Sequence, residues 1–122
     1  MNFLAVAIGA ALGGVLRYSA SLALPWDGRS FPWATFLVNM AGSLAIGIAF
    51  ALWARPQDET ARLFFISGVL GGFTTFSTFS LEAVRLASDG RWAKAAILVA
   101  AAGSLGPLLA GIGWLAASRL VR

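Results

Sequence analysis

Four long apolar segments constrain the fold of this chain more than any other feature. They run over about residues 3–24, 31–54, 63–86 and 92–118 of the 122-residue sequence, and each matches the length of about 20 residues with which an α-helix crosses the hydrocarbon of a bilayer. The connections between them are short and hold proline, glycine and charged residues. The pattern therefore predicts an all-α integral membrane protein, with residues 1–122 forming a single domain of four transmembrane helices.

The composition supports a membrane protein and removes much of the chemistry that enzymes use. The chain is 59% hydrophobic and 11% charged, whereas about 25% of residues are charged in an average soluble domain. It has no histidine and no cysteine, so zinc sites, thiol nucleophiles and the commonest general base are excluded. Only one of its five acids, Glu82, lies near an apolar segment. We therefore expect neither an enzyme nor a nucleic-acid-binding protein.

The third apolar segment contains the sequence GGFTTFSTFS, at residues 71–80. Five of the seven residues from Thr74 to Ser80 carry a hydroxyl group, and two glycines precede them. Both features disfavour a continuous helix, because glycine is flexible and hydroxyl groups compete for backbone hydrogen bonds. In a membrane, interrupted helices are tolerated only where they are buried in protein or line a wet cavity. We predict that the third helix is broken in mid-membrane and faces a polar path.

The second apolar segment carries a polar stripe. Thr35, Asn39 and Ser43 recur every four residues, so they lie on one face of a helix, where the polar residues of the third segment can meet them. An asparagine in mid-membrane is costly unless it is paired or wet. Two interpretations remain open, namely hydrogen bonding between helices and the lining of a path. Ser104, near Pro107, is the single polar point in the middle of the fourth segment.

A path with these side chains favours an anion. It has no acid or base at its centre, which argues against a proton relay. Amide and hydroxyl groups can donate hydrogen bonds to an anion, and the edge of a phenylalanine ring is electropositive. Phe76 and Phe79 alternate with hydroxyl residues and are expected to border the path. Arg17 either raises the positive potential near a mouth or extends its charge to the membrane surface.

Eight of the nine cationic residues are evenly divided between the two sides of the membrane, and Arg17 is left inside a span. One side holds Arg55, Arg62, Arg119 and Arg122, and the other holds Arg29, Arg85, Arg91 and Lys94. Membrane proteins are oriented by an excess of Lys and Arg on the cytoplasmic side, and this chain has no such excess. It is either inserted in one orientation with weak bias, or inserted in both and paired as an antiparallel dimer. A four-helix subunit has little interior for a path, which favours an oligomer.

Three motifs resemble those of the CrcB/Fluc fluoride channels. They are the sequences GGVLRY at residues 13–18, TFLVN at residues 35–39 and GGFTTFSTF at residues 71–79. The resemblance extends over the whole chain in length, number of spans and motif order, and the third motif is the most specific. One departure is Ala34, where a glycine often precedes the threonine of the second motif.

The resemblance implies a dual-topology, antiparallel homodimer that exports fluoride passively and confers fluoride resistance. It implies two fluoride pores, a location in the cell (inner) membrane with several crossings, and a structural sodium ion held by the backbone carbonyls of Gly71 and Thr74 of both subunits. The implied pore residues comprise an amide, two ring edges, hydroxyl groups and two charged groups near the mouths: Asn39, Phe76, Phe79, Ser77, Thr78, Ser104, Arg17 and Glu82.

Two other classes of protein have this size. A small dual-topology multidrug exporter would need a carboxylate in the first span to couple transport to protons, and that span contains no acid. A non-transporting subunit of a membrane assembly would explain the small residues, but it would leave the Thr/Ser/Phe segment unexplained.

Overall fold

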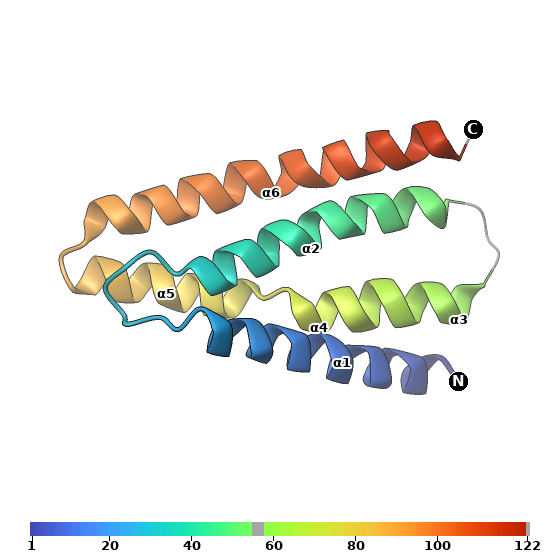
Figure 1. The fold of residues 1–122 in the computed structure, drawn as a ribbon, viewed down its shortest axis with the longest axis horizontal. Helices are drawn as coiled ribbons and strands as arrows, with labels where there is room; N and C mark the ends of the chain where they lie inside the picture. Colours follow the sequence, from blue (N-terminus) through green and yellow to red (C-terminus); the bar gives the residue numbers. More distant parts are fainter. Residues whose placement is uncertain (55–57, 122) are drawn as a thin grey trace.

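The computed structural model describes residues 1–54 and 58–121, and every regular element among them is helical. Three crossings are single helices, namely α1 (Asn2–Ala23), α2 (Trp33–Leu52) and α6 (Trp92–Leu120). The remaining crossing consists of α3 (Glu59–Arg62), the π-helical η1 (Leu63–Leu70), α4 (Gly71–Phe73) and α5 (Phe76–Ser88) (Figure 1). All four crossings are long and apolar enough to span a membrane, which confirms the prediction of an all-helical, multi-pass membrane protein.

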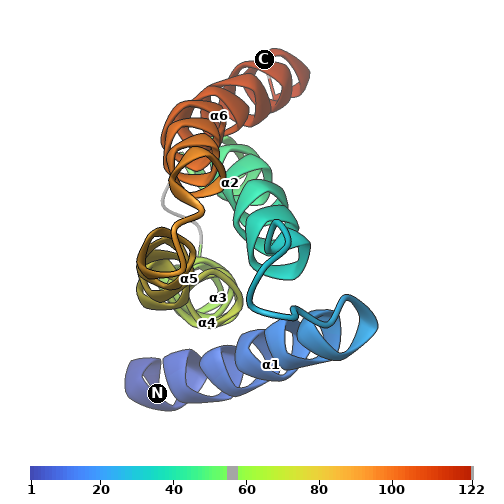
Figure 2. The ribbon, with the colours of Figure 1, turned by 90° about the vertical axis from the view of Figure 1, so that its left-hand side faces the viewer.

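The four crossings run alternately up and down, so both termini lie at one end of the molecule (Figure 1). The connection between α1 and α2 and the turn between α5 and α6 lie at the other end. α2 packs mainly on α6, while α1 packs mainly on η1 and α4. As Figure 2 shows, α1 and α6 therefore lie at opposite edges of the bundle.

Glycines lie at two close helix crossings. A Cβ atom added to Gly9 or Gly13 of α1 would collide with the carbonyl oxygen of Phe64 or Val69 in η1. At the crossing of α2 and α6, a Cβ atom at Gly47 or Gly113 would meet a backbone carbonyl of the facing helix in the same way. Small residues let helix backbones approach closely where no water drives them together.

The interior of the helix bundle is small. Its compact hydrophobic core lies at the end that holds the α1–α2 connection, where Leu86 and Leu98 are fully buried. Along the rest of the bundle, large apolar side chains point outward, and Phe50 and Leu115 are 62% and 52% exposed. Such a surface is compatible with contact with lipid tails.

Two residues separate α4 from α5. Thr74 and Thr75 have extended backbones, with ψ angles of 155° and 122°. The two helical parts of this crossing are therefore joined by a short non-helical link, which Figure 1 shows near the middle of the bundle. The amides and carbonyls around this link lose their usual helical partners, and the polar residues of the chain gather there.

Candidate functional site

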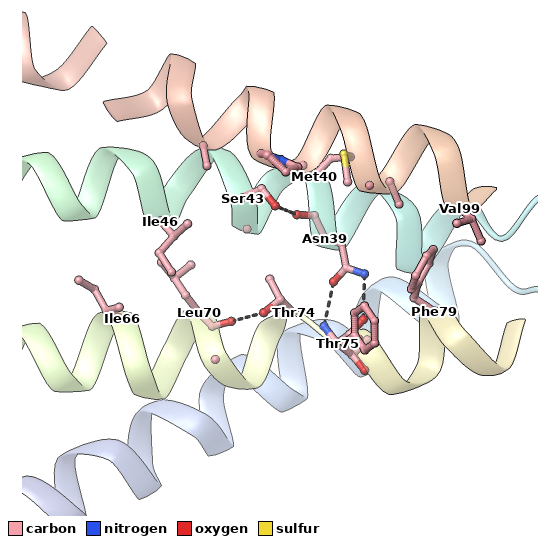
Figure 3. Close-up of a pocket in the computed structure, with 18 residues that line it drawn as sticks. Asn39, Met40, Ser43, Ile46, Ile66, Leu70, Thr74, Thr75, Phe79 and Val99 are labelled. Atoms are coloured by element: carbon pink, nitrogen blue, oxygen red, sulfur yellow. Dashed lines mark hydrogen bonds between the residues drawn. The ribbon is translucent and has the colours of Figure 1, made fainter. Parts of the chain in front are cut away.

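Asn39 of α2 binds the link between α4 and α5. Its Oδ1 accepts a hydrogen bond from the backbone N–H of Thr75 at 2.8 Å, and its Nδ2 donates to the Thr75 carbonyl at 2.9 Å (Figure 3). The side-chain amide thus pairs with both backbone groups of one residue, as a neighbouring strand would. Interhelical hydrogen bonding, one of the two interpretations of the polar stripe, is confirmed for this residue.

Thr75 is also the N-cap residue of α5. Its Oγ1 accepts from the backbone N–H of Thr78 at 3.3 Å and lies 3.2 Å from the Thr78 Oγ1, which is the usual role of threonine at a helix N-cap. Sequence reasoning did not single out Thr75 as a site residue. A hydroxyl residue immediately before a new helical segment was the available signal.

The carbonyls of Gly71 and Thr74 lose the donors that a continuous α-helix would supply. Those donors are the N–H groups four residues later, on Thr75 and Thr78, and they donate instead to the Asn39 side chain and to Thr75 Oγ1. Two carbonyl oxygens are thereby released at the link. Such oxygens are suitable ligands for a small hard cation, and no cluster of three His, Cys, Asp or Glu residues competes for a metal in the described part of the chain.

Arg17 of α1 reaches the same link from the other side. Its Nε donates to the Gly72 carbonyl at 3.2 Å, where α4 ends. A cation is favourable at the C-terminal end of a helix, because unpaired carbonyls give that end a partial negative charge. The guanidinium group therefore points into the bundle and not to the membrane surface.

A cavity of about 410 Å³ lies beside Arg17, between α1, α2 and α5. Five hydroxyl residues and one cation supply its polar lining: Arg17, Tyr18, Ser21, Thr35, Thr75 and Thr78. We call this space the donor-lined cavity. Tyr18 and Ser21 were not among the predicted site residues, and in the sequence they follow Arg17 on the helix that supplies it.

A second and larger space, of about 640 Å³, lies between α2, α6 and the interrupted crossing (Figure 3). Its lining is mostly apolar, and it includes site residues from all three crossings: Asn39, Ser43, Gly71, Thr74, Thr75, Phe76, Phe79, Gly103 and Pro107. We call this space the lateral groove. The structure thus brings the predicted amide, both predicted ring edges and both candidate carbonyl residues to one place.

The two predicted phenylalanines differ in their surroundings. Phe76 is 79% exposed, so most of its ring has no neighbour within the chain. Phe79 is partly buried against the core that contains Leu86 and Leu98. Their ring centroids are 5.7 Å apart with planes tilted by 51°, so the two rings are neighbours that are neither stacked nor perpendicular.

Glu82 is buried, with 6% of its surface exposed. Its Oε2 accepts a hydrogen bond from Thr35 Oγ1 at 2.9 Å, and its Oε1 has no partner among the described residues. Thr35 also lines the donor-lined cavity. Glu82 is thus held next to that cavity by a residue of the polar stripe.

Ser77 and Ser104 are not brought into either space. Ser77 is exposed, with its Oγ 3.5 Å from Thr75 Oγ1. Ser104 is exposed too, and its Oγ donates to the carbonyl of Ala100 in its own helix at 2.6 Å. The residues of this part of α6 that line the lateral groove include Gly103 and Gly106 but not Ser104.

Comparison with known proteins gives a consistent result. The family model described as CrcB-like protein, Camphor Resistance (CrcB), matches residues 4–114. A protein of Methylobacterium nodulans named fluoride-specific ion channel FluC is 46% identical, over 99% of this chain and 95% of its own length. Proteins with the same name from Paramagnetospirillum magneticum and Bordetella petrii are 40% and 50% identical, over 100% and 78% of this chain and 99% and 74% of their own lengths.

Proposed function

This chain belongs to the CrcB-like family, and we propose that it forms a fluoride-selective ion channel. The observation that carries the proposal is the interrupted third crossing. It places an amide, several hydroxyl groups and two phenylalanine rings around one short link, with a single cation beside it. These groups donate hydrogen bonds or present positive ring edges. A continuous helix at this position would not gather them around one point.

The working unit we propose is an antiparallel homodimer with the link in mid-membrane. One subunit has an accessible surface of 7674 Å², whereas a compact monomer of its mass would have roughly 6,200 Å². The exposed ring of Phe76, beside the lateral groove, is part of this surface. A second copy seated on this face would cover the ring and close the groove into a path. Isologous contact between two copies would produce two equivalent paths.

In the proposed path, an anion meets the two sets of residues one after the other. Anions enter the donor-lined cavity, where Arg17 supplies positive potential and the hydroxyls of Tyr18, Ser21 and Thr78 replace water. They then pass the free N–H of the Asn39 amide and the ring edges of Phe76 and Phe79. Fluoride is small and strongly hydrated, so closely spaced donors are needed to replace its water. Chloride is larger and would be excluded by the narrow spacing.

A structural sodium ion fits the released carbonyls. Gly71 and Thr74 of each subunit would hold it on the dimer axis, and it would supply the positive charge that these oxygens lack. Every unpaired carbonyl in a membrane costs several kcal/mol, so one ion shared by two subunits stabilises both. The ion lies between the two anion paths, and fluoride flux is therefore independent of the sodium gradient.

Transport is passive in this proposal. Glu82, the only buried acid among residues 1–54 and 58–121, is hydrogen-bonded to Thr35 at the side of the donor-lined cavity and not at the centre of the path. A channel of this kind in the cell (inner) membrane of a microbe lets fluoride leave the cytoplasm down its gradient, which provides fluoride resistance.

Reconstitution tests the function. Liposomes containing only this protein are loaded with potassium fluoride, and efflux is followed with a fluoride electrode after addition of a potassium ionophore. We expect rapid fluoride release and no comparable release from liposomes loaded with chloride. Retention of fluoride would contradict the proposal, and a multidrug exporter or an assembly subunit would then explain the fold better.

A further inference from the structure

The end of the bundle opposite the termini carries four cationic residues. They are Arg29 in the α1–α2 connection, Arg85 in the last turn of α5, and Arg91 and Lys94 at the start of α6 (Figure 1). No carboxylate in residues 1–54 or 58–121 lies within 4.0 Å of their charged nitrogens. We call these four residues the basic cluster. The channel proposal does not use any of them.

Arg85 is held in place by its neighbours and is still accessible. Its guanidinium carbon lies 5.3 Å from the centroid of the Trp26 ring, within the range of a cation–π contact. Gly28, with a φ of 81°, allows the connection to pass close by, because an added Cβ atom would lie 3.3 Å from Nη2 of Arg85. Trp26 is itself fixed by a 2.7 Å hydrogen bond from Nε1 to the Ser30 carbonyl. The guanidinium thus has a defined position before any ligand arrives.

Lys94 binds the same connection from the other helix. Its Nζ donates to the Arg29 carbonyl at 3.0 Å, which uses one of its three donors. Arg91 lies one turn earlier, and its Nε is buried with no hydrogen-bond partner in the described part of the chain. α5, α6 and the connection therefore each contribute cations to one end of the bundle, and several of their donors are unused.

The acids at this end do not neutralise the basic cluster. Asp27 accepts hydrogen bonds through Oδ1 from the N–H groups of Ser30 and Arg29 and from the Ser30 hydroxyl. These bonds lower the pKa of its carboxyl group to about 2, so the group is charged at neutral pH. Its Oδ1 is engaged by the connection itself and not by a cation of the basic cluster. Asp89 is exposed in the α5–α6 turn. Four cations against these two acids leave a positive excess.

Exposed tryptophans indicate the depth of the basic cluster in the membrane. Trp33 and Trp92, at the first residues of α2 and α6, are 54% and 70% exposed. Tryptophan concentrates at the level of the lipid headgroups. The anions present in quantity at that level are lipid phosphodiesters. We propose that the basic cluster binds the phosphodiester headgroup of an anionic phospholipid, with Arg85 and Lys94 as the principal contacts.

The other end of the bundle provides a matched control. Arg62 and Arg119, in the last turns of α3 and α6, are exposed cations at the opposite membrane surface. Within residues 1–54 and 58–121, neither arginine is stacked on an aromatic ring, and neither has a side-chain hydrogen bond to another crossing. A general attraction of cations to an anionic surface would affect both ends equally, whereas a formed headgroup site would affect only one.

The test measures the thermal stability of the detergent-solubilised protein during titration with phosphatidylglycerol. We expect a saturable rise in Tm with phosphatidylglycerol and none with phosphatidylcholine. The double variant Arg85→Gln/Lys94→Gln should bind about 25-fold more weakly, since each interfacial cation is worth about fivefold. The control Arg62→Gln/Arg119→Gln should bind as the unmodified protein does. Lys94→Gln alone removes one exposed cation without touching the Trp26 stack and should lose about fivefold.

Three results would overturn the proposal. Equal losses in the control and test variants would reduce the effect to general surface charge. An equal Tm rise with inorganic phosphate would identify a free-anion site and not a lipid site. Loss of fluoride efflux by Lys94→Gln in liposomes made only of phosphatidylcholine would assign the basic cluster to the channel mouth. Normal efflux of that variant there, with weakened phosphatidylglycerol binding, supports a separate lipid site.

Discussion

Asn39 holds the link between α4 and α5, and the proposed channel gives the same side chain a second role. The Oδ1 atom and one N–H of the amide hold the backbone N–H and C=O of Thr75, and in our proposal the second N–H serves the anion. The hydrogen bonds fix the link, and the link in turn fixes the amide. Substitutions at this position therefore test structure and transport together, and only the choice of replacement separates the two roles.

Asn39→Asp is expected to abolish fluoride efflux. The change keeps the size of the side chain but removes the donor to the Thr75 carbonyl, at a cost of about 1–3 kcal/mol for an unpaired buried group. It also places an acceptor that is usually negative beside the anion path. Asn39→Ser keeps one donor and should retain partial efflux. The measurement is electrode-recorded efflux from liposomes, with Ser19→Ala as a control because that hydroxyl only bonds within α1. An active Asp variant would exclude a donor role for this side chain.

The variants Phe76→Ile and Phe79→Ile distinguish the effect of a ring edge on efflux from the effect of apolar bulk. Isoleucine fills similar space without an electropositive edge, and we expect efflux to fall by roughly tenfold in each variant, corresponding to about 1.4 kcal/mol. The stability of the subunit should change only for Phe79, since Phe76 is largely exposed and Phe79 packs on the core. Leu81→Ile, at another exposed position of α5, should change neither quantity. Normal efflux in both phenylalanine variants would assign these rings to packing alone.

At the scale of elements, two devices determine how the four crossings fit together. The third crossing is divided by two extended residues. Groups from other crossings bind on either side of this division, namely Arg17 from α1 at Gly72 and Asn39 from α2 at Thr75. The uninterrupted crossings are instead placed by glycines that bring backbones together. The first device gives the chain its polar site, and the second gives that site a rigid frame.

Gly113→Ala and Gly111→Ala test the frame on a single helix. A Cβ atom at Gly113 would collide with the Leu44 carbonyl, whereas one at Gly111 would meet nothing within 4 Å. We expect Gly113→Ala to destabilise the protein by about 1–3 kcal/mol, as overpacking does. Gly111→Ala should be neutral or slightly stabilising, because alanine is the better helix former. Thermal unfolding in detergent measures both. Equal Tm values for the two variants would show that α2 and α6 are not held by close backbone contact.

At the scale of the whole molecule, the even division of charge is the feature that matters. At one end the structure places Arg29, Arg85, Arg91 and Lys94. At the other it places Arg62 and Arg119, while Arg55 and Arg122 lie outside the described residues. Without an excess of cations on either side, insertion in both orientations has similar cost. The antiparallel dimer that we propose depends on this balance.

Three lysines inserted between residues 55 and 62 are expected to force one orientation and abolish fluoride efflux. With all subunits in one orientation, no antiparallel pair can form. Three lysines inserted in the turn at residues 88–91 should force the opposite orientation and be inactive alone. Co-expression of the two variants should restore efflux, and this rescue distinguishes a lost partner from a lost fold. Full activity of either variant by itself would contradict the antiparallel dimer.

The sequence by itself determined the number of crossings, the membrane environment and the location of the polar site. Four apolar stretches cannot be stable in water, and hydroxyl residues such as Thr74 and Thr75 next to a glycine pair disfavour a helix wherever they lie. These properties are local, and a sequence displays local properties directly. The predicted segment limits differ from the helices by up to four residues, because capping groups such as Asp58 start a helix outside the apolar run.

Only the tertiary structure decided which polar group meets which. Asn39 could have paired with any neighbouring helix, and its contact with Thr75 follows from the packing of α2 beside the link. Arg17 could have extended to the membrane surface, and the closeness of α1 to α4 instead brings it to Gly72. Ser104 carries a promising hydroxyl, but the rotation of α6 leaves it outside both spaces. Rotation and crossing of helices depend on contacts between distant residues, and no local pattern in a single sequence encodes them.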